Sequence, residues 1–164
     1  METSTQELPT LHLVCGKIAS GKSTLTQRLA AEPKTILISE DEWLGQLFPG
    51  EISTLQDYVR CTGRLRSVIG VHVEHLLRAG ISVVLDFPAN TLDSRLWMRS
   101  IFEHAGSAHS LHYLDVSDEV CKARLQRRNL DGSHRYTTSE AEFDAITRYF
   151  VAPSSAEGFN IVKE

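Results

Sequence analysis

The sequence lacks the features of membrane proteins and of secreted proteins. It contains no run of the roughly 18 apolar residues that a membrane-spanning helix needs. Its opening residues, METSTQELPT, lack the basic and then apolar order of a secretory signal. Cysteine is scarce, and the 3 cysteines are widely spaced and odd in number, which suggests neither a disulfide framework nor a CxxC metal site. We therefore expect a cytoplasmic protein with reduced thiols and no membrane partner.

An excess of basic charge is also absent. The chain has 17 Lys and Arg residues against 21 Asp and Glu, a formal net charge of −4. The overall charge therefore does not favour a nucleic-acid partner, and a small molecule is the preferred ligand. The 164 residues, 41% of them hydrophobic, are enough for one packed core, and no repeat or linker divides them. We predict a single domain over residues 1–164, with its oligomeric state left open.

Short apolar stretches alternate with helical patterns along the chain. Strands are predicted at 11–15, 35–39, 81–87, 110–116 and 159–163, and helices near 22–31, 53–79, 90–105, from 117 onward and at 139–150. Ser53 with Gln56 forms a capping-box pattern, Asn90 can cap the next helix, and Gly80 can end the long one. This alternation predicts an α/β fold, with a doubly wound, mostly parallel five-stranded sheet that carries helices on both faces.

The stretch GKIASGKS, residues 16–23, matches the phosphate-loop pattern G-x-x-x-x-G-K-[ST] between a predicted strand and a predicted helix. Small residues let backbone N–H groups turn towards phosphate oxygens, and the helix directs its positive dipole end at them. Lys22 would reach the β- and γ-phosphates, and the Ser23 hydroxyl would ligate Mg²⁺. The alternative is a glycine turn that merely joins strand to helix. The pattern predicts a P-loop NTPase fold with ATP and Mg²⁺ as cofactors, although it does not separate ATP from GTP. The expected nucleotide-binding residues are Gly16, Lys17, Ala19, Ser20, Gly21, Lys22, Ser23 and Thr24.

The sequence lacks the motifs that mark two classes of nucleotide-dependent protein, the GTPases and the motor ATPases. The guanine-reading motif N-K-x-D is absent, and the strand VVLDF ends in one acidic residue where a motor protein usually has two. The chain does carry an acidic cluster after the second strand, SEDEW at 39–43, and a basic cluster, RLQRRN at 124–129. A phosphotransferase needs both kinds of group.

These motifs resemble those of the small P-loop kinases, the group that contains phage-type polynucleotide 5′-kinases, chloramphenicol phosphotransferase and zeta toxins. The resemblance rests on GKIASGKST, ISEDEW, VVLDFPAN and CKARLQRRN, which follow in that order over essentially the whole chain. It implies an enzyme that moves the γ-phosphate of ATP to an alcohol group. It also implies that Asp41 accepts the proton of the acceptor hydroxyl, with Glu40 and Glu42 as competitors, and that residues from about 127–138 form a lid. The alternative for Asp41 is a solvated acidic turn that caps a helix at 41–47.

Several of the candidate acidic, hydroxyl and basic side chains should lie close together in the folded chain. The carboxyl ends of parallel strands meet at one rim of the sheet, so Ser23, Asp41 and Asp86 should emerge there. Asp86 would bind Mg²⁺ with Ser23 or orient substrate, unless it merely ends a buried strand. Arg124 and Arg128 lie four residues apart on one helical face and would act with Lys22 to neutralise charge on the transferring phosphate. The alternative for these arginines is an ordinary charged helix end.

The residues that would bind the phosphate acceptor are harder to identify from the sequence. Arg64, Asn90 and Arg95 are candidate substrate contacts, although a surface salt bridge or a helix cap explains each of them more simply. Leu44 stands where phage-type polynucleotide kinases tend to have a phosphate-holding arginine, which favours a small, partly apolar acceptor. We therefore predict an ATP- and Mg²⁺-dependent phosphotransferase that acts on a small-molecule hydroxyl. The alternatives are a nucleotide or polynucleotide 5′-kinase and, from another class, a nucleotide-dependent regulatory ATPase.

Overall fold

The computed structural model describes residues 7–132 and 137–164. Within these ranges the strands are β1 (Thr10–Gly16), β2 (Thr35–Ser39), β3 (Ser82–Pro88), β4 (Ala108–Leu114) and β5 (Ile161–Lys163). The helices are α1 (Lys22–Ala30), α2 (Glu40–Leu47), α3 (Leu55–Arg78), α4 (Leu92–Ala105), α5 (Asp118–Asp131) and α6 (Glu140–Thr147), and the short 3₁₀ turn η1 (Ser155–Glu157) precedes β5. The predicted strands and helices are present, with ends that differ by a few residues. Among the described residues, no helix is both long and apolar enough to cross a membrane.

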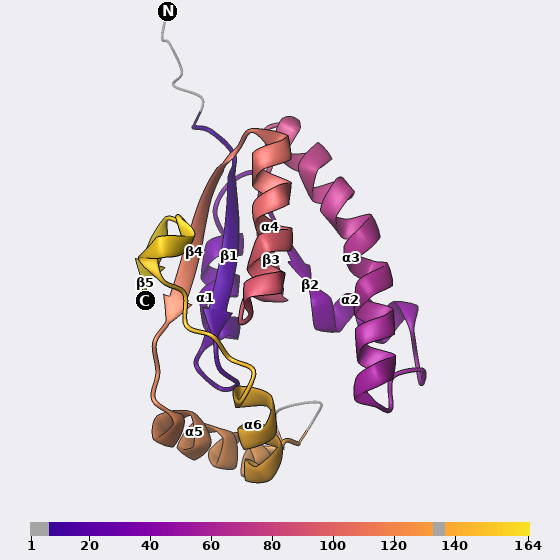
Figure 1. Ribbon diagram of the computed structural model, residues 1–164, viewed down its shortest axis with the longest axis vertical. Coiled ribbons are helices and arrows are strands. Elements are labelled where there is room, and N and C mark those ends of the chain that lie inside the picture. The colour runs from indigo at the N-terminus through magenta and orange to yellow at the C-terminus, as the bar shows by residue number, and fades with distance from the viewer. Residues whose placement is uncertain (1–6, 133–136) are drawn as a thin grey trace, which may run out of the picture.

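The strands form one sheet in the order β2-β3-β1-β4-β5. Every neighbouring pair is parallel, and β1 lies at the centre, with β3 on one side and β4 on the other. The carboxyl ends of the strands therefore meet at one edge, which in Figure 1 faces α5 and α6. This topology confirms the doubly wound parallel sheet that the alternation of elements predicts.

Helices cover both faces of the sheet, with α1 behind it and α4 in front of it in Figure 1. On the face of α1, Val14 of β1 and Leu114 of β4 pack with Leu25. On the opposite face, Leu11 and Leu13 of β1 belong to the largest buried cluster, which also contains side chains of α3 and α4. Because successive side chains of a strand point to opposite faces, the mostly apolar β1 can supply both layers of the core.

The buried core also contains the three cysteines, and helices α3 and α4 approach closely within it. Cys15, Cys61 and Cys121 are all buried and free, in agreement with the expectation of reduced thiols. A Cβ atom on Gly70 of α3 would lie only 3.3 Å from Nε1 of Trp97, so a small residue is needed where α3 approaches α4.

The capping box of α3 lies one residue later than the sequence predicts. Thr54, not Ser53, is the N-cap residue: its Oγ1 accepts a hydrogen bond from Asp57 N at 3.1 Å, and Asp57 Oδ2 accepts from Thr54 N at 3.1 Å. Asp at the third helical position closes the box here, so the prediction based on Gln56 is wrong. Gly80 follows α3 with a φ of +84°, as the sequence predicts.

Helices α5 and α6 form a separate layer beyond the carboxyl edge of the sheet (Figure 1). Cys121 and Leu125 of α5 pack against Phe143 of α6, and Ile18 and Ala19 of the glycine-rich loop pack at the margin of the same cluster. This layer therefore rests on the loop that follows β1.

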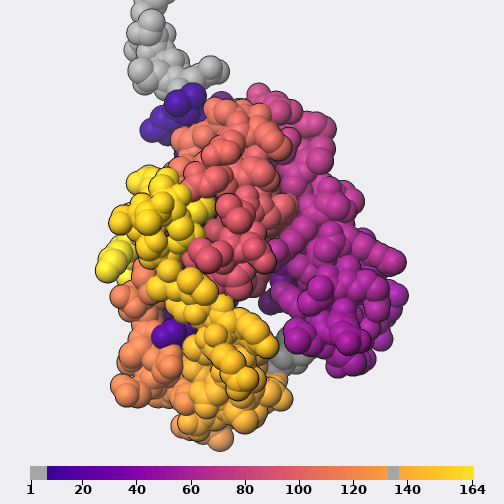
Figure 2. Space-filling model, viewed as in Figure 1, coloured from indigo at the N-terminus to yellow at the C-terminus, as the bar shows by residue number. Residues whose placement is uncertain are grey.

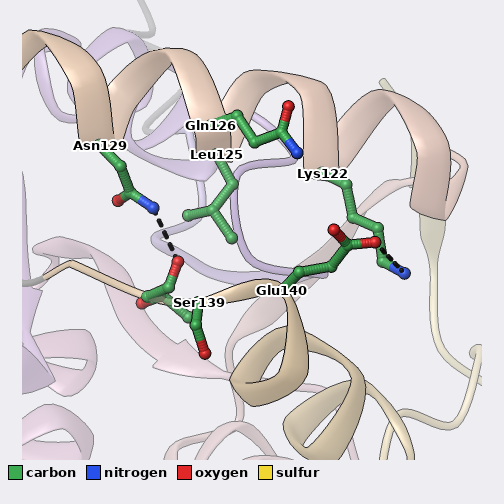
Figure 3. A pocket seen from close by; sticks show the side chains of 7 residues that line it. Lys122, Leu125, Gln126, Asn129, Ser139 and Glu140 are labelled. Atoms are coloured by element: carbon green, nitrogen blue, oxygen red, sulfur yellow. Dashed lines mark hydrogen bonds and ion pairs between the residues drawn. The ribbon is translucent and has the colours of Figure 1, made fainter.

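Polar contacts around a small pocket of about 100 Å³ also fasten α6 to α5 (Figure 3). Lys122 Nζ lies 3.3 Å from Glu140 and 2.9 Å from Asp144, and Asn129 Nδ2 donates to the Thr138 carbonyl at 2.7 Å. The lid predicted at about 127–138 overlaps this region, because its first residues complete α5. Its residues 133–136 lie outside the described residues.

Candidate active site

The loop between β1 and α1 folds into a tight backbone concavity. Gly21 has a φ of +104° and Ala19 a φ of +62°, both in the region that favours glycine. A Cβ atom on Gly16 would meet Ser20 Oγ at 2.5 Å, so a glycine is needed for this close approach. Successive N–H groups in such a loop make an anion-binding concavity, and its shape fits a chain of phosphates.

Lys22 lies inside this loop. Its Nζ donates to the carbonyl oxygens of Gly16 and Lys17, each at 2.7 Å. Burial lowers the pKa of Lys22, whereas the nearby charge of Asp86 acts in the opposite direction. Ser23 and Thr24 follow in the exposed first turn of α1. The cation at the base of the phosphate loop is thus half-buried and within electrostatic reach of the acid that the sequence assigns to Mg²⁺.

The side-chain amide of Asn90 is hydrogen-bonded to the phosphate loop. Its Oδ1 accepts from Gly16 N at 3.0 Å, and its Nδ2 donates to the Gly16 carbonyl at 3.0 Å. The cap of α4 is Thr91, whose side chain accepts from Ser94 N. Both predictions for Asn90, helix cap and acceptor contact, therefore need correction, because its amide group joins the end of β3 to the end of β1.

Helix α5 is fastened to the same loop at two points. Lys17 Nζ lies 2.6 Å from Asp118 Oδ1 in the first turn of α5 and donates to the Val116 carbonyl at 3.3 Å. Six residues further along α5, Arg124 Nη1 donates to the Ser20 carbonyl at 3.3 Å. The sequence-predicted Arg124 therefore lies beside the phosphate loop.

Arg128 lies one turn beyond Arg124 and is half-buried. Burial lowers the pKa of Arg128, and its charge acts on Lys22, which places the two cations near one another. Its Nε atom is buried and has no hydrogen-bond partner among the described residues. Arg127, in contrast, is exposed. An arginine with an unused donor beside the phosphate loop is suited to an anionic ligand.

Two acids lie together at the ends of adjacent strands. Ser39 at the end of β2 pairs in register with Asp86 of β3, and Asp41 follows in the exposed first turn of α2. Burial raises the pKa of Asp86, the charge of Asp41 raises it further, and Lys22 opposes the effect. Asp41, Asp86 and Lys22 are thus electrostatic neighbours at the carboxyl edge, where the sequence predicts them.

A hollow opens beside this edge. Figure 2 shows it between α6 and the beginning of α3, on the side of the sheet to which the strand ends point in Figure 1. Such a crevice beyond the carboxyl ends of the strands is the usual ligand position in an open α/β sheet.

Arg95 and Arg64, two predicted acceptor contacts, have different positions. Arg95 is 0% exposed: Nε pairs with Glu157 Oε1 at 2.7 Å, and Nη1 donates to the carbonyls of Ala89 and Val151, each at 2.9 Å. The prediction for Arg95 is therefore wrong, because its donors are used to hold the C-terminal segment against α4. Arg64 is exposed on α3.

A buried polar cluster behind Asp41 was not found by sequence reasoning. Glu40 is only 2% exposed, and its Oε1 accepts from the Tyr58 hydroxyl at 2.5 Å. Arg66 Nη2 lies 3.8 Å from Glu40 Oε2, and its guanidinium stacks over the Trp97 ring at 4.9 Å. Burial raises the pKa of Glu40. The signal in the sequence was the spacing of Tyr58 and Arg66, two helical turns apart on α3.

Leu44 does not line the crevice. It is 4% exposed and belongs to the main core cluster. Its side chain therefore offers no apolar contact to an acceptor. The preference for a small, partly apolar acceptor now depends only on the lack of an arginine at this position.

The site contains one carboxylate that fits a magnesium ion. Mg²⁺ in phosphotransferases typically takes one or two carboxylates, a hydroxyl, water and phosphate oxygens. Ser23 at the start of α1 and Asp86 at the end of β3 match this donor set. Among the described residues, no group of three or more His, Cys, Asp or Glu side chains could hold a metal by itself.

Comparison with known proteins places this geometry in a family. The family model AAA_33, described as an AAA domain, matches residues 11–153. No curated protein matches the sequence. Among solved structures, a candidate kinase from Chloroflexus aurantiacus is 21% identical with a TM-score of 0.71, and the match covers 96% of this chain and 85% of that one.

Two further structures have the same fold. A sugar kinase from Janibacter sp. HTCC2649 is 19% identical with a TM-score of 0.64, and the match covers 96% of this chain and 86% of that one. A chain of the Pnkp1/Rnl/Hen1 RNA repair complex is 18% identical with a TM-score of 0.68, and the match covers 91% of this chain but only 46% of that one. With a family model that spans most of its length and a sheet of P-loop kinase topology, this chain belongs to the AAA_33 family and has the fold of the small P-loop kinases.

Proposed function

We propose that the protein is an ATP- and Mg²⁺-dependent phosphotransferase whose acceptor is the hydroxyl of a small molecule. The observation that carries the proposal is the meeting of Lys22, Asp86 and Asp41 at the carboxyl edge of the sheet. A nucleotide-binding module that only regulates or assembles needs the phosphate loop but not a second acid at this position.

The donor half of the site would be formed by the phosphate loop. Backbone N–H groups of residues 16–23 would hold the phosphates, with Lys22 between the β- and γ-groups. Ser23 and Asp86 would hold Mg²⁺, which supplies charge neutralisation on the phosphate oxygens when it is bound. Asn90 would keep the loop in its folded shape through its two bonds to Gly16.

The acceptor half would depend on Asp41. Its carboxylate lies exposed near Asp86 and can accept the proton of an acceptor hydroxyl as that hydroxyl attacks the γ-phosphorus in line, while the bond from the γ-phosphorus to the bridging oxygen breaks and ADP leaves. Arg124 and Arg128 approach the same loop from α5 and would stabilise the negative charge of the transferring group.

The test is transfer of label from γ-labelled ATP to pooled sugars, nucleosides, antibiotics and oligonucleotides. We expect transfer to a small molecule, and loss of transfer in Asp41→Asn by about 10²-fold or more. Glu42→Gln, an exposed acid one residue further along α2, is the matched control and should transfer normally. Full activity of Asp41→Asn would show that another group is the base, and unchanged ATP affinity of Lys22→Ala would remove the phosphate-loop assignment.

The same experiment decides the second candidate function. A 5′-kinase acting on nucleotides or polynucleotides is favoured by the likeness in fold to a chain of an RNA repair complex. It is disfavoured by the identity of residue 44, because Leu44 offers no phosphate-holding cation at that position. Preferential labelling of oligonucleotide ends would replace our proposal with this one.

A further inference from the structure

Helix α2, which carries Asp41, depends on very few contacts for its orientation. It has eight residues, and Glu40 and Leu44, one turn apart, are its buried ones. A helix of this length is marginal by itself in water, so tertiary contacts must fix its position and its rotation. Leu44 packs into the apolar core, which leaves Glu40 as the polar anchor of the first turn.

The contacts of Glu40 are directional. Its Oε1 accepts from the Tyr58 hydroxyl at 2.5 Å, and its Oε2 lies 3.8 Å from Arg66 Nη2. Arg66 is itself held from two sides, because Nη1 donates to Ser94 Oγ at 3.2 Å and the guanidinium stacks on Trp97. A hydrogen bond in a buried environment is stronger and more costly to break than one in water.

We propose that Glu40 and Tyr58 are positioning residues that fix the rotation of α2, so that the carboxylate of Asp41 faces Asp86 and the acceptor side of the crevice. The role assigned to Asp41 rests on the proposed function. Asp41 is the next residue after Glu40, so a small rotation of this turn displaces its carboxylate. Misplacement of a reacting group by about 1 Å can cost a factor of about 10² in rate.

Glu40 is not suited to be the base itself. A general base must come within hydrogen-bond reach of the proton that it accepts. Glu40 is only 2% exposed, and one of its oxygens is already bonded to Tyr58. The sequence left Glu40 and Asp41 as competing candidates, and the geometry assigns them different tasks.

The test uses Tyr58→Phe, with Tyr113→Phe as a matched control. Tyr113 on β4 also loses a hydroxyl that donates to a carboxylate, but the bond is an exposed one, to Asp115 Oδ1 at 3.2 Å. We expect Tyr58→Phe to lower kcat for ATP turnover by at least about tenfold, with KM for ATP changed less than twofold. Amide hydrogen exchange should become faster in residues 40–47 and stay unchanged in residues 22–30. Tyr113→Phe should change none of these quantities.

A rescue series separates positioning from a loss of packing. Glu40→Gln keeps a carbonyl oxygen for the Tyr58 hydroxyl and should retain more kcat than Glu40→Ala, which removes the acceptor atom. Equal loss in both variants, unchanged exchange in residues 40–47 of Tyr58→Phe, or faster exchange in residues 22–30 as well would overturn the proposal. If exchange responds as expected but Asp41→Asn is as active as the parent protein, the positioning of α2 stands and the base assignment fails.

Discussion

The side-chain amide of Asn90 forms a pair of hydrogen bonds with the backbone of Gly16, one to its N–H and one from Nδ2 to its carbonyl, each at 3.0 Å. The Gly16 carbonyl also accepts from Lys22 Nζ at 2.7 Å. The segment that follows β3 therefore holds the first residue of the phosphate loop in place, and Asn90 connects the donor half of the site to the strand that carries Asp86.

Asn90→Asp should weaken ATP binding by about tenfold, a change of about 1.4 kcal/mol. The substitution replaces the Nδ2 donor with an acceptor that faces the Gly16 carbonyl, and it adds a negative charge beside the phosphate site. Isothermal titration calorimetry measures the change. Asn160→Asp is the matched control, because Asn160 is exposed and its Nδ2 makes only a long bond of 3.4 Å to the His109 carbonyl. Equal affinity in both variants would show that the pair does not support the loop.

Local patterns explain why the fold and the phosphate loop could be predicted. The loop motif has fixed spacing, and its position between a strand and a helix is visible in a window of some twenty residues around Gly16 and Lys22. Parallel strand topology then places Asp41 and Asp86 at one edge, although they are far apart in the sequence. Both inferences need only short-range pattern and general topology.

The contacts that sequence reasoning missed all depend on a distant partner. An asparagine just before a helix is typical of an N-cap residue. No nearby residue indicates that the side-chain amide of Asn90 will bond to the backbone of Gly16 instead. Arg95 has the appearance of a surface residue, since arginine is seldom fully buried unless it is paired, and its partner Glu157 lies 62 residues later. Leu44, in contrast, could have been assigned to the core from its helical spacing.

Arg95→Met should lower the free energy of unfolding by about 3 kcal/mol. The change leaves Glu157 without its ion-pair partner and leaves the carbonyls of Ala89 and Val151 without their donor. Urea denaturation measures the loss. The double variant Arg95→Met with Glu157→Gln should recover part of it, because the uncompensated carboxylate is then gone. No recovery would mean that the lost carbonyl bonds, not the unpaired charge, dominate the cost.

Acid should destabilise the protein through His12. Its Nδ1 lies 3.0 Å from His112 Nε2, and burial, followed by the effect of His112, lowers the pKa of His12 from 6.5 to about 4. Between these two values the unfolded chain binds the proton more readily than the folded one, so stability is lost as the pH falls from about 6.5 towards about 4. Urea denaturation at several pH values should show a steeper loss in the parent protein than in His12→Gln. Parallel profiles would contradict this assignment.

Arg128→Ala should lower kcat for phosphoryl transfer by about 10²-fold or more, whereas Arg127→Ala should leave kcat within about twofold. The two arginines are neighbours on α5 and carry the same charge, but Arg127 is exposed, whereas the Nε atom of Arg128 is buried without a partner among the described residues and its charge acts on Lys22. If only the overall charge of α5 attracted the nucleotide, both variants would weaken ATP binding equally and kcat would be unaffected. A donor aimed at the transferring group acts mainly in the transition state, so its loss should appear in kcat more than in KM. Steady-state kinetics of the two variants at saturating ATP distinguishes these outcomes.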